Sequence, residues 1–235
     1  MISAKILVSW LATLALTLVF ASAAPFIDSL AWSQSRPVNE ELAAIAKAQA
    51  ANAQRLAKYT WEQMVLITVN GQAQEYLVYG VKIGGDGQLE RNLITQDTGN
   101  SAAFEPSTKQ QKTEYEPFAR QLEELAARYT ALDSDRLLGA GKRGDVALQR
   151  AAGTLTLVIK NYVKPNDFLS MKMDQQTYNL VGAEARSYLT DPKDAVTIKV
   201  QFDQLPDGTN HIARAEIDSV NKHLTVKEEN SFFTK

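Results

Sequence analysis

The stretch DAVTIKVQFDQLPDGTNHIARAEI, residues 194–217, predicts two β-strands joined by a turn. In its first half four apolar residues alternate with polar ones, which is the period-two pattern of a strand with one buried face. The four are Val196, Ile198, Val200 and Phe202, and the polar residues between them are Thr197, Lys199 and Gln201. The segment LPDGTN supplies Pro, Asp, Gly and Asn, which tight turns require. Such a short connection makes the two strands antiparallel neighbours.

Strands of the same kind fill the last third of the chain. Their predicted ranges are 154–163, 167–174, 178–189, 194–203, 211–218 and 222–232. Turns such as KPND, DQQT and DPKD separate them. The connections are too short for parallel crossovers, so the strands should form an antiparallel meander.

An N-terminal hairpin is predicted over 59–83, because Asn70-Gly71 is a strong signal for a two-residue turn. A two-residue loop pairs Trp61 with Gly80, so that the aromatic ring covers the backbone of a residue without a side chain. One face then carries Trp61, Val65, Ile67, Tyr76 and Val78, and the other carries Met64, Leu66, Leu77 and Tyr79. Since both sets are apolar, we expect both faces of the hairpin to be covered.

Helices are predicted on either side of this hairpin and a weak strand at 89–95. The first spans 39–58 with Asn39 as its N-cap, and the second spans 113–132 with a capping box formed by Thr113 and Glu116. A short third helix follows from Ser134 to Gly139. Residues 96–112 lack a pattern and are predicted to be a surface loop or, alternatively, a mobile flap. The order of elements indicates the α+β class.

The first 23 residues have the features of a signal peptide. Lys5 precedes an uncharged apolar run, and Ala21-Ser22-Ala23 is a cleavage pattern. An uncleaved membrane anchor is the alternative. We expect a tether over 24–38, a single α+β domain over 39–235, no membrane span after cleavage, and a periplasmic or secreted location. The absence of cysteine excludes a lipobox and disulfides.

Composition and motifs argue against several functions. The formal charge of −2 gives no basic excess for nucleic acid. The segment GAGKRG, residues 139–144, matches a dinucleotide fingerprint by letter, but it follows a helical pattern instead of a strand. We interpret it as a flexible connection between a helix and a strand.

The acidic residues and histidines do not form a predicted site. His211 and His223 should lie about 20 Å apart on neighbouring strands, too far to share a metal, and we expect both at the surface. Asp191, Asp194, Asp203 and Asp207 lie in turns, beside Pro192 or Gly208. No nucleophile motif is found. We therefore predict no catalytic, cofactor-binding or metal-binding residues, and no enzyme activity.

Three blocks and a terminal segment of the chain carry a family resemblance. The blocks are YTWEQMV (59–65), NYVKPNDFLSM (161–171) and YLTDPKDAVTIKVQFDQLPDG (188–208), and the terminal segment is LTVKEENSFF (224–233). In these segments the chain resembles a family of uncharacterised exported bacterial proteins. The order of elements also resembles, remotely, the periplasmic lipoprotein carriers and their receptor of the Lol, or lipoprotein-sorting, type. That resemblance implies a curved, mostly antiparallel sheet, an incomplete barrel of about nine strands, with two or three helices packed on or into it.

Two functions remain open at this point. The protein is either a cell-envelope binding protein that carries a lipid or other apolar ligand in the concave face of its sheet, or a non-enzymatic envelope scaffold that contacts another envelope protein and has a fully packed core. For the first function, an acyl chain would contact a broad apolar surface. Its predicted residues are Trp61, Tyr76, Val78, Leu169, Met171, Met173, Val200 and Phe202.

Overall fold

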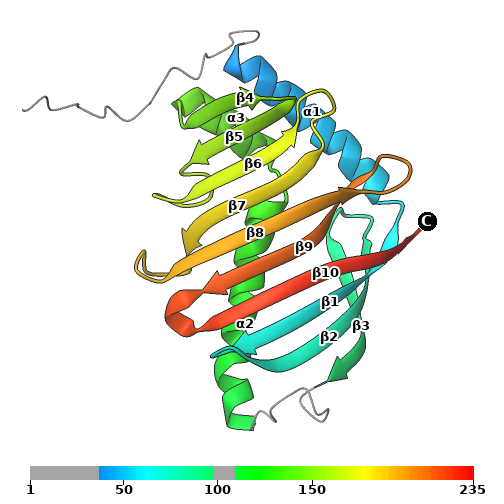
Figure 1. Ribbon diagram of the computed structural model, residues 1–235, viewed down its shortest axis with the longest axis vertical. Helices are drawn as coiled ribbons and strands as arrows, with labels where there is room; N and C mark the ends of the chain where they lie inside the picture. The colour runs from blue at the N-terminus through cyan, green and yellow to red at the C-terminus, as the bar shows by residue number, and fades with distance from the viewer. Residues whose placement is uncertain (1–36, 98–108) are drawn as a thin grey trace, which may run out of the picture. The chain divides into compact units, whose positions relative to one another are not determined.

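The computed structural model describes residues 37–97 and 109–235, and these contain one ten-stranded antiparallel sheet (Figure 1). The strands are β1 (Thr60–Val69), β2 (Gln72–Ile83), β3 (Leu89–Asp97), β4 (Val146–Ala151), β5 (Thr154–Lys160), β6 (Phe168–Asp174), β7 (Leu180–Tyr188), β8 (Ala195–Gln204), β9 (Asn210–Ser219) and β10 (Leu224–Thr234). Their order is β3-β2-β1-β10-β9-β8-β7-β6-β5-β4, so the sheet is not closed into a barrel. The predicted α+β class with a curved antiparallel sheet is confirmed.

The chain builds this sheet in two parts, of three and seven strands, that meet where β1 pairs with β10. Strands β4 to β10 form an unbroken meander, as the short turns predict. The N-terminal β1–β2–β3 unit then extends the sheet, because β1 pairs with β10 along most of its length. The first and last strands of the described chain are therefore neighbours (Figure 1).

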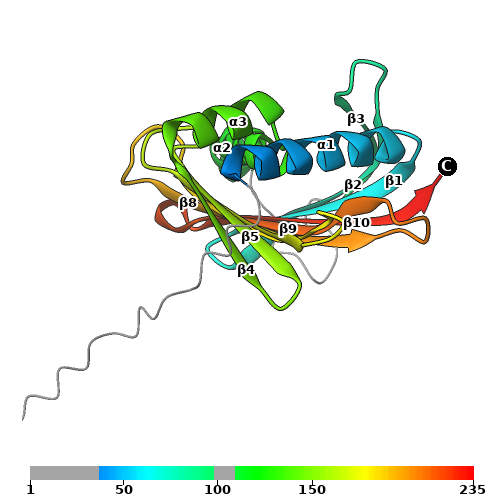
Figure 2. The ribbon, with the colours of Figure 1, turned by 90° about the horizontal axis from the view of Figure 1, so that it is seen from above.

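Three helices lie on one side of the sheet (Figure 2). They are α1 (Val38–Leu56), α2 (Lys109–Thr130) and α3 (Ser134–Arg143), and a 3-10 turn, η1 (Val220–Lys222), joins β9 to β10. Helix α2 runs across the strands, whereas α1 and α3 pack against each other. At their crossing a Cβ on Gly141 would lie 2.5 Å from Cδ1 of Leu42, so glycine permits the close approach of α1.

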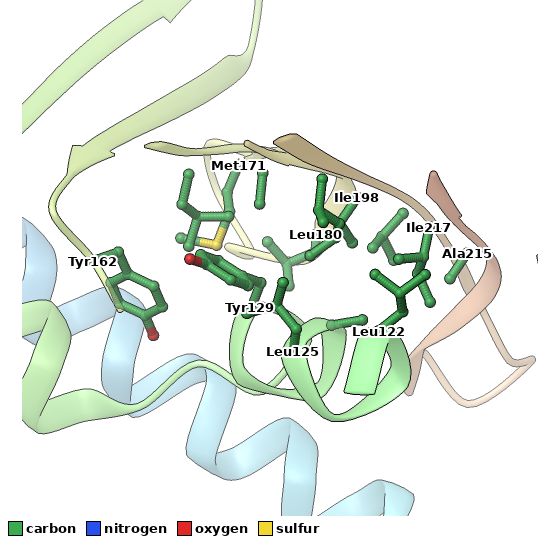
Figure 3. Packing of buried hydrophobic residues seen from close by; sticks show 14 of the residues in the cluster. Leu122, Leu125, Tyr129, Tyr162, Met171, Leu180, Ile198, Ala215 and Ile217 are labelled. Carbon is green, nitrogen blue, oxygen red and sulfur yellow. The ribbon is translucent and has the colours of Figure 1, made fainter. Parts of the chain in front are cut away.

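The core lies between the three helices and the sheet, and α2 contributes the largest share of its helical residues. Leu122, Leu125 and Tyr129 of α2 point toward the apolar residues of the strands (Figure 3). One cross-strand row consists of Leu157, Met171, Ala183, Val200 and Ala215. Burial of such rows against the α2 stripe supplies the hydrophobic stabilisation of the fold.

Several predicted boundaries are wrong in detail. Strand β4 was not expected, because its turn to β5 is Ala152-Gly153, in which Ala152 takes a left-handed φ of 46° without a residue type that announces it. Helix α3 continues to Arg143, so most of GAGKRG is helical and Gly144 is its left-handed C-cap. Helix α2 begins at Lys109, and the proposed capping box lies inside the helix. Helix α1 begins at Val38 after an N-cap at Pro37.

The predicted register of the hairpin is also wrong, by one residue. A bulge after Ile67 places Trp61 opposite Val81 and Glu62 opposite Gly80. A shift of one residue in the pairing moves the side chains of a strand to the other face of the sheet. Tyr76 and Val78 therefore lie on the opposite face from Trp61. Only one hairpin face is covered by the described helices (Figure 2), which corrects the expectation that both are.

The expected signal peptide and nearly all of the expected tether lie outside the described residues, as does most of the patternless stretch, 98–108. The ends of that stretch belong to β3 and α2. Within 37–97 and 109–235, no helix is both long and apolar enough to cross a membrane.

A buried carboxylate organises the loop between β5 and β6. Asp167, which is 3% exposed, accepts hydrogen bonds from the backbone N–H groups of Tyr162 (2.6 Å), Val163 (2.8 Å) and Lys164 (2.7 Å). The hydroxyl of Tyr129 in α2 also donates to it. Burial and this bond raise the pKa of Tyr129, so its hydroxyl stays protonated and ties α2 to the loop.

We expect Asp167→Ala to lower the free energy of unfolding by about 3 kcal/mol or more, because several buried donors lose their acceptor. Asp191→Ala, which removes an exposed turn acceptor for the N–H of Lys193, is the control and should cost about 0.5 kcal/mol. Denaturant unfolding measures both. Equal effects would show that the Asp167 cluster does not anchor α2.

Candidate functional site

The face of the sheet without helices carries ordered rows of polar and apolar side chains. Because directly paired residues share a face, the registers define these rows. One row consists of Lys199, Glu216, Lys227, Leu66 and Tyr76. The next consists of Gln201, Arg214, Glu229, Met64 and Val78. Charged residues come from β8, β9 and β10, and apolar residues come from β1 and β2.

These rows surround a hollow with a volume of about 560 Å³, here called the open-face hollow. It is lined by Met64, Leu66, Tyr76, Lys199, Gln201, Arg214, Ala215, Glu216, Lys227, Glu228 and Glu229. Ala215 and Glu228 pair with each other in a row of the helix-covered face. The open-face hollow thus has an apolar side on β1 and β2 and a charged side on β8 to β10.

The charged side contains two ion pairs and two unengaged groups. Lys227 lies 3.3 Å from Glu216, and Arg214 lies 3.3 Å from Glu229. Both pairs are solvent-exposed, so each contributes at most about 1 kcal/mol and opens easily. Within the part of the chain that the structure describes, neither Lys199 nor Gln201 has an ion pair or side-chain hydrogen bond. One cation and one amide are therefore available to a ligand.

The apolar side is held by a contact between two strands. The Tyr76 hydroxyl lies 2.9 Å from the sulfur of Met64, and Leu66 is paired directly with Tyr76. All three side chains are half-buried, which leaves apolar surface facing the hollow. A flexible thioether beside an aromatic ring is an adaptable surface for an apolar group.

The structure divides the predicted ligand-binding residues between the two faces. Six lie on the helix-covered face: Trp61, Leu169, Met171, Met173, Val200 and Phe202. Trp61 stacks on Phe233 with ring centroids 5.5 Å apart and donates to Asn230. The other two, Tyr76 and Val78, lie on the open face, where Tyr76 lines the hollow.

The charged residues of the open-face hollow were not predicted as a site. The alternation in residues 194–203 does place Lys199 and Gln201 opposite Val200. Their neighbours on β9, β10 and β1 depend on three registers, and η1 shifts the pairing of β9 with β10 by three residues from that expected. A period-two pattern contains no information about such shifts.

A polar network joins α2 to the sheet directly beneath the open-face hollow. Arg91 of β3 lies 2.8 Å from Glu123 of α2 and 3.8 Å from Glu228 of β10. Gln63 donates to Glu228, which is 13% exposed. Burial raises the pKa of the Glu228 carboxyl; the positive charge of Arg91 opposes this shift, and the negative charge of Glu123 adds to it.

The two histidines have different environments. His223 is exposed, as predicted, but His211 is buried at 8% exposure, with its ring centroid 4.2 Å from that of Phe233. The prediction for His211 is wrong because the C-terminal end of β10 extends over it. The turn interpretation of Asp191 and Asp207 is confirmed by their bonds to nearby backbone N–H groups. Among the described residues, no group of three or more His, Cys, Asp or Glu is placed to hold a metal.

No protein-family model matches the sequence, and no curated protein matches it significantly. Among solved structures, the chain is similar to a DUF1329 family protein from Desulfovibrio piger, with 11% identity, a TM-score of 0.37 and coverage of 80% of this chain and 91% of that one. The chain is also similar to a LolA superfamily protein from Nitrosomonas europaea, with 11% identity and a TM-score of 0.37. That match covers 80% of this chain and 92% of the other. The expected remote resemblance to lipoprotein-sorting folds is thus found, but similarity this low assigns neither ligand nor site.

We expect Glu228→Gln to raise the free energy of unfolding near neutral pH. A carboxyl whose pKa is raised by folding stabilises the protein in its protonated form, and this stability is lost as pH rises through the folded pKa. Glutamine is neutral at every pH, so its advantage over wild type should shrink on mild acidification. Denaturant unfolding at both pH values measures the difference.

Glu229→Gln, on the solvated opposite face, gives the baseline for removing one carboxylate from the same strand. If Glu228→Gln has no higher free energy of unfolding than wild type at neutral pH, or if the difference does not depend on pH, Glu228 is not a carboxyl that is costly to ionise.

Proposed function

We propose that the protein is a non-catalytic binding protein of the cell envelope that holds an amphiphilic ligand, such as a lipid with an anionic group, in the open-face hollow. The observation that carries this proposal is the division of the hollow into an apolar side and a side with an unengaged cation. The signal-peptide pattern of residues 1–23 supports the envelope location.

The dimensions of the hollow favour an elongated ligand. Lys199 on β8 and Leu66 on β1 belong to one row but are separated by three strand spacings, about 14 Å. A molecule with its anionic group on Lys199 and Gln201 would cross β9 and β10 to reach Leu66 and Tyr76. The volume of about 560 Å³ falls within the range of small-molecule sites.

Ligand binding by the apolar row under α2 is a second proposal, taken from the sequence. Leu169, Met171 and Met173 are at most 1% exposed, so a ligand could contact them only if the helices that cover this face moved away from the sheet. The same observation favours an alternative function. A fully packed core is what we expect of a non-enzymatic envelope scaffold that binds another protein through its surface.

A dansyl-labelled fatty acid tests the open-face proposal. We expect saturable binding to the wild type and binding about tenfold weaker for both Leu66→Ser and Lys199→Gln, since one loses apolar contact and the other a charge-assisted hydrogen bond. Fluorescence titration measures the affinities.

The chain offers matched controls for both substitutions. Lys172→Gln removes a cation from the same row as Gln201, on β6, and Val181→Ser removes an apolar side chain that is 51% exposed on β7. Neither residue lines the open-face hollow. Wild-type affinity in Leu66→Ser and Lys199→Gln, or equal weakening in the controls, would reject this site.

A second experiment separates a core row from an internal ligand site. We expect Met171→Glu and Val200→Glu each to destabilise the fold by about 3 kcal/mol or more, because each buries an unpaired carboxylate. Thermal melting measures this loss, and native mass spectrometry measures bound lipid. If both variants stay folded and only lipid uptake is lost, the ligand lies under α2. If the wild type binds no lipid, the scaffold alternative is favoured.

A further inference from the structure

A second hollow, of about 300 Å³, lies between α3 and the loop that connects β5 to β6. It is here called the basic hollow and is lined by Arg136, Arg143, Asn161, Tyr162, Val163, Lys164 and Pro165. Three of these seven residues are cations and none is a carboxylate. The carboxylates that pair with its arginines, Asp133 and Asp145, are not among the lining residues, whereas the lining of the open-face hollow contains three glutamates.

Helix α3 presents the two arginines on one side. Arg136 and Arg143 are seven residues apart, about two helical turns, and therefore lie along the same face. Arg143 Nε donates to Asp145 at 2.7 Å, and Arg136 lies 3.5 Å from Asp133. Each guanidinium has five N–H donors, and both side chains remain about half exposed. Both retain donors for a further acceptor.

The third cation is fixed in place by backbone carbonyl groups. The Nζ of Lys164 donates to the carbonyl oxygens of Tyr188 at 2.6 Å and Leu189 at 2.5 Å. An ammonium group has three donors, so one remains. Burial, followed by the positive charge of Arg128, lowers the pKa of Lys164. The negative charge of Asp167 opposes this shift.

The loop side of the basic hollow is preformed. Asp167 fixes the N–H groups of residues 162–164 from inside, and Asn161 accepts a bond from the N–H of Asn166 at 2.8 Å. Rigid positions for Lys164 and its neighbours reduce the entropy lost when an anion binds.

We propose that the basic hollow binds a phosphate group through Arg136, Arg143 and Lys164. Arginine donors match phosphate oxygens in pairs, and a lysine ammonium adds a point charge. The group belongs either to a free phosphorylated molecule or to a lipid headgroup, since the chemistry is the same. This site is separate from the open-face hollow and does not depend on the function proposed for it.

Amide NMR titration with inorganic phosphate tests the site itself. We expect saturable shifts in residues 161–164 and an affinity about tenfold lower in the double variant Arg136→Gln/Arg143→Gln. The control is Arg120→Gln/Arg186→Gln, which removes two exposed arginines from α2 and β7 and should retain wild-type affinity. The single variant Arg136→Gln, with an intermediate loss, covers the case in which the double variant is unstable.

Sedimentation with vesicles identifies the source of the phosphate. Phosphatidylcholine vesicles are compared with vesicles that contain equal parts of phosphatidylcholine and phosphatidylglycerol. Pelleting that requires the anionic lipid and both arginines assigns a lipid headgroup, whereas saturable phosphate binding without pelleting assigns a free phosphorylated ligand. If phosphate shifts do not saturate and pelleting is unchanged in the arginine variants, the proposal is wrong.

Discussion

The packing of one helix across the sheet is the interaction on which this fold depends. An open sheet of ten strands has two faces, and it requires a hydrophobic cover on at least one of them. The α2 residues Leu122, Leu125 and Tyr129 provide that cover over the central strands, along which the cross-strand row of Met171 and Val200 runs. The other two helices on this face, α1 and α3, pack mainly against each other, so loss of the α2 contact would expose the core over the central strands.

Hydrophobic burial is not directional, and polar contacts at the margins set the positions of the helices. The Tyr129–Asp167 bond fixes the C-terminal part of α2 to the β5–β6 loop, and the Arg91–Glu123 pair fixes its middle to β3. Helix α1 has an equivalent anchor, because Asn52 both donates to and accepts from the backbone of Asn210 at 2.7 and 2.8 Å. These partners are far apart in sequence, so each bond also selects one arrangement of the elements.

The sequence predicts what alternation and turn chemistry can encode. The strands of the meander and the buried face of 194–200 are correct, because period two and Pro, Asn or Gly turns report directly on local structure. Errors occur where the backbone departs from that regularity: the bulge after Ile67, the left-handed Ala152 before β5, and η1 before β10. Each of these changes register or strand number without an unusual residue to indicate it.

The candidate site is predictable only in part for the same reason. The face of Lys199 follows from its own strand, but its alignment with Glu216, Lys227 and Leu66 follows from registers across four strands. The two faces are also linked, because successive side chains of a strand point to opposite faces. The neighbours along the strand of each residue buried against the helices therefore lie on the open face. The core rows therefore determine the spacing of the rows on the open face, and a binding surface built there has its geometry fixed by the packing of α2 on the other side.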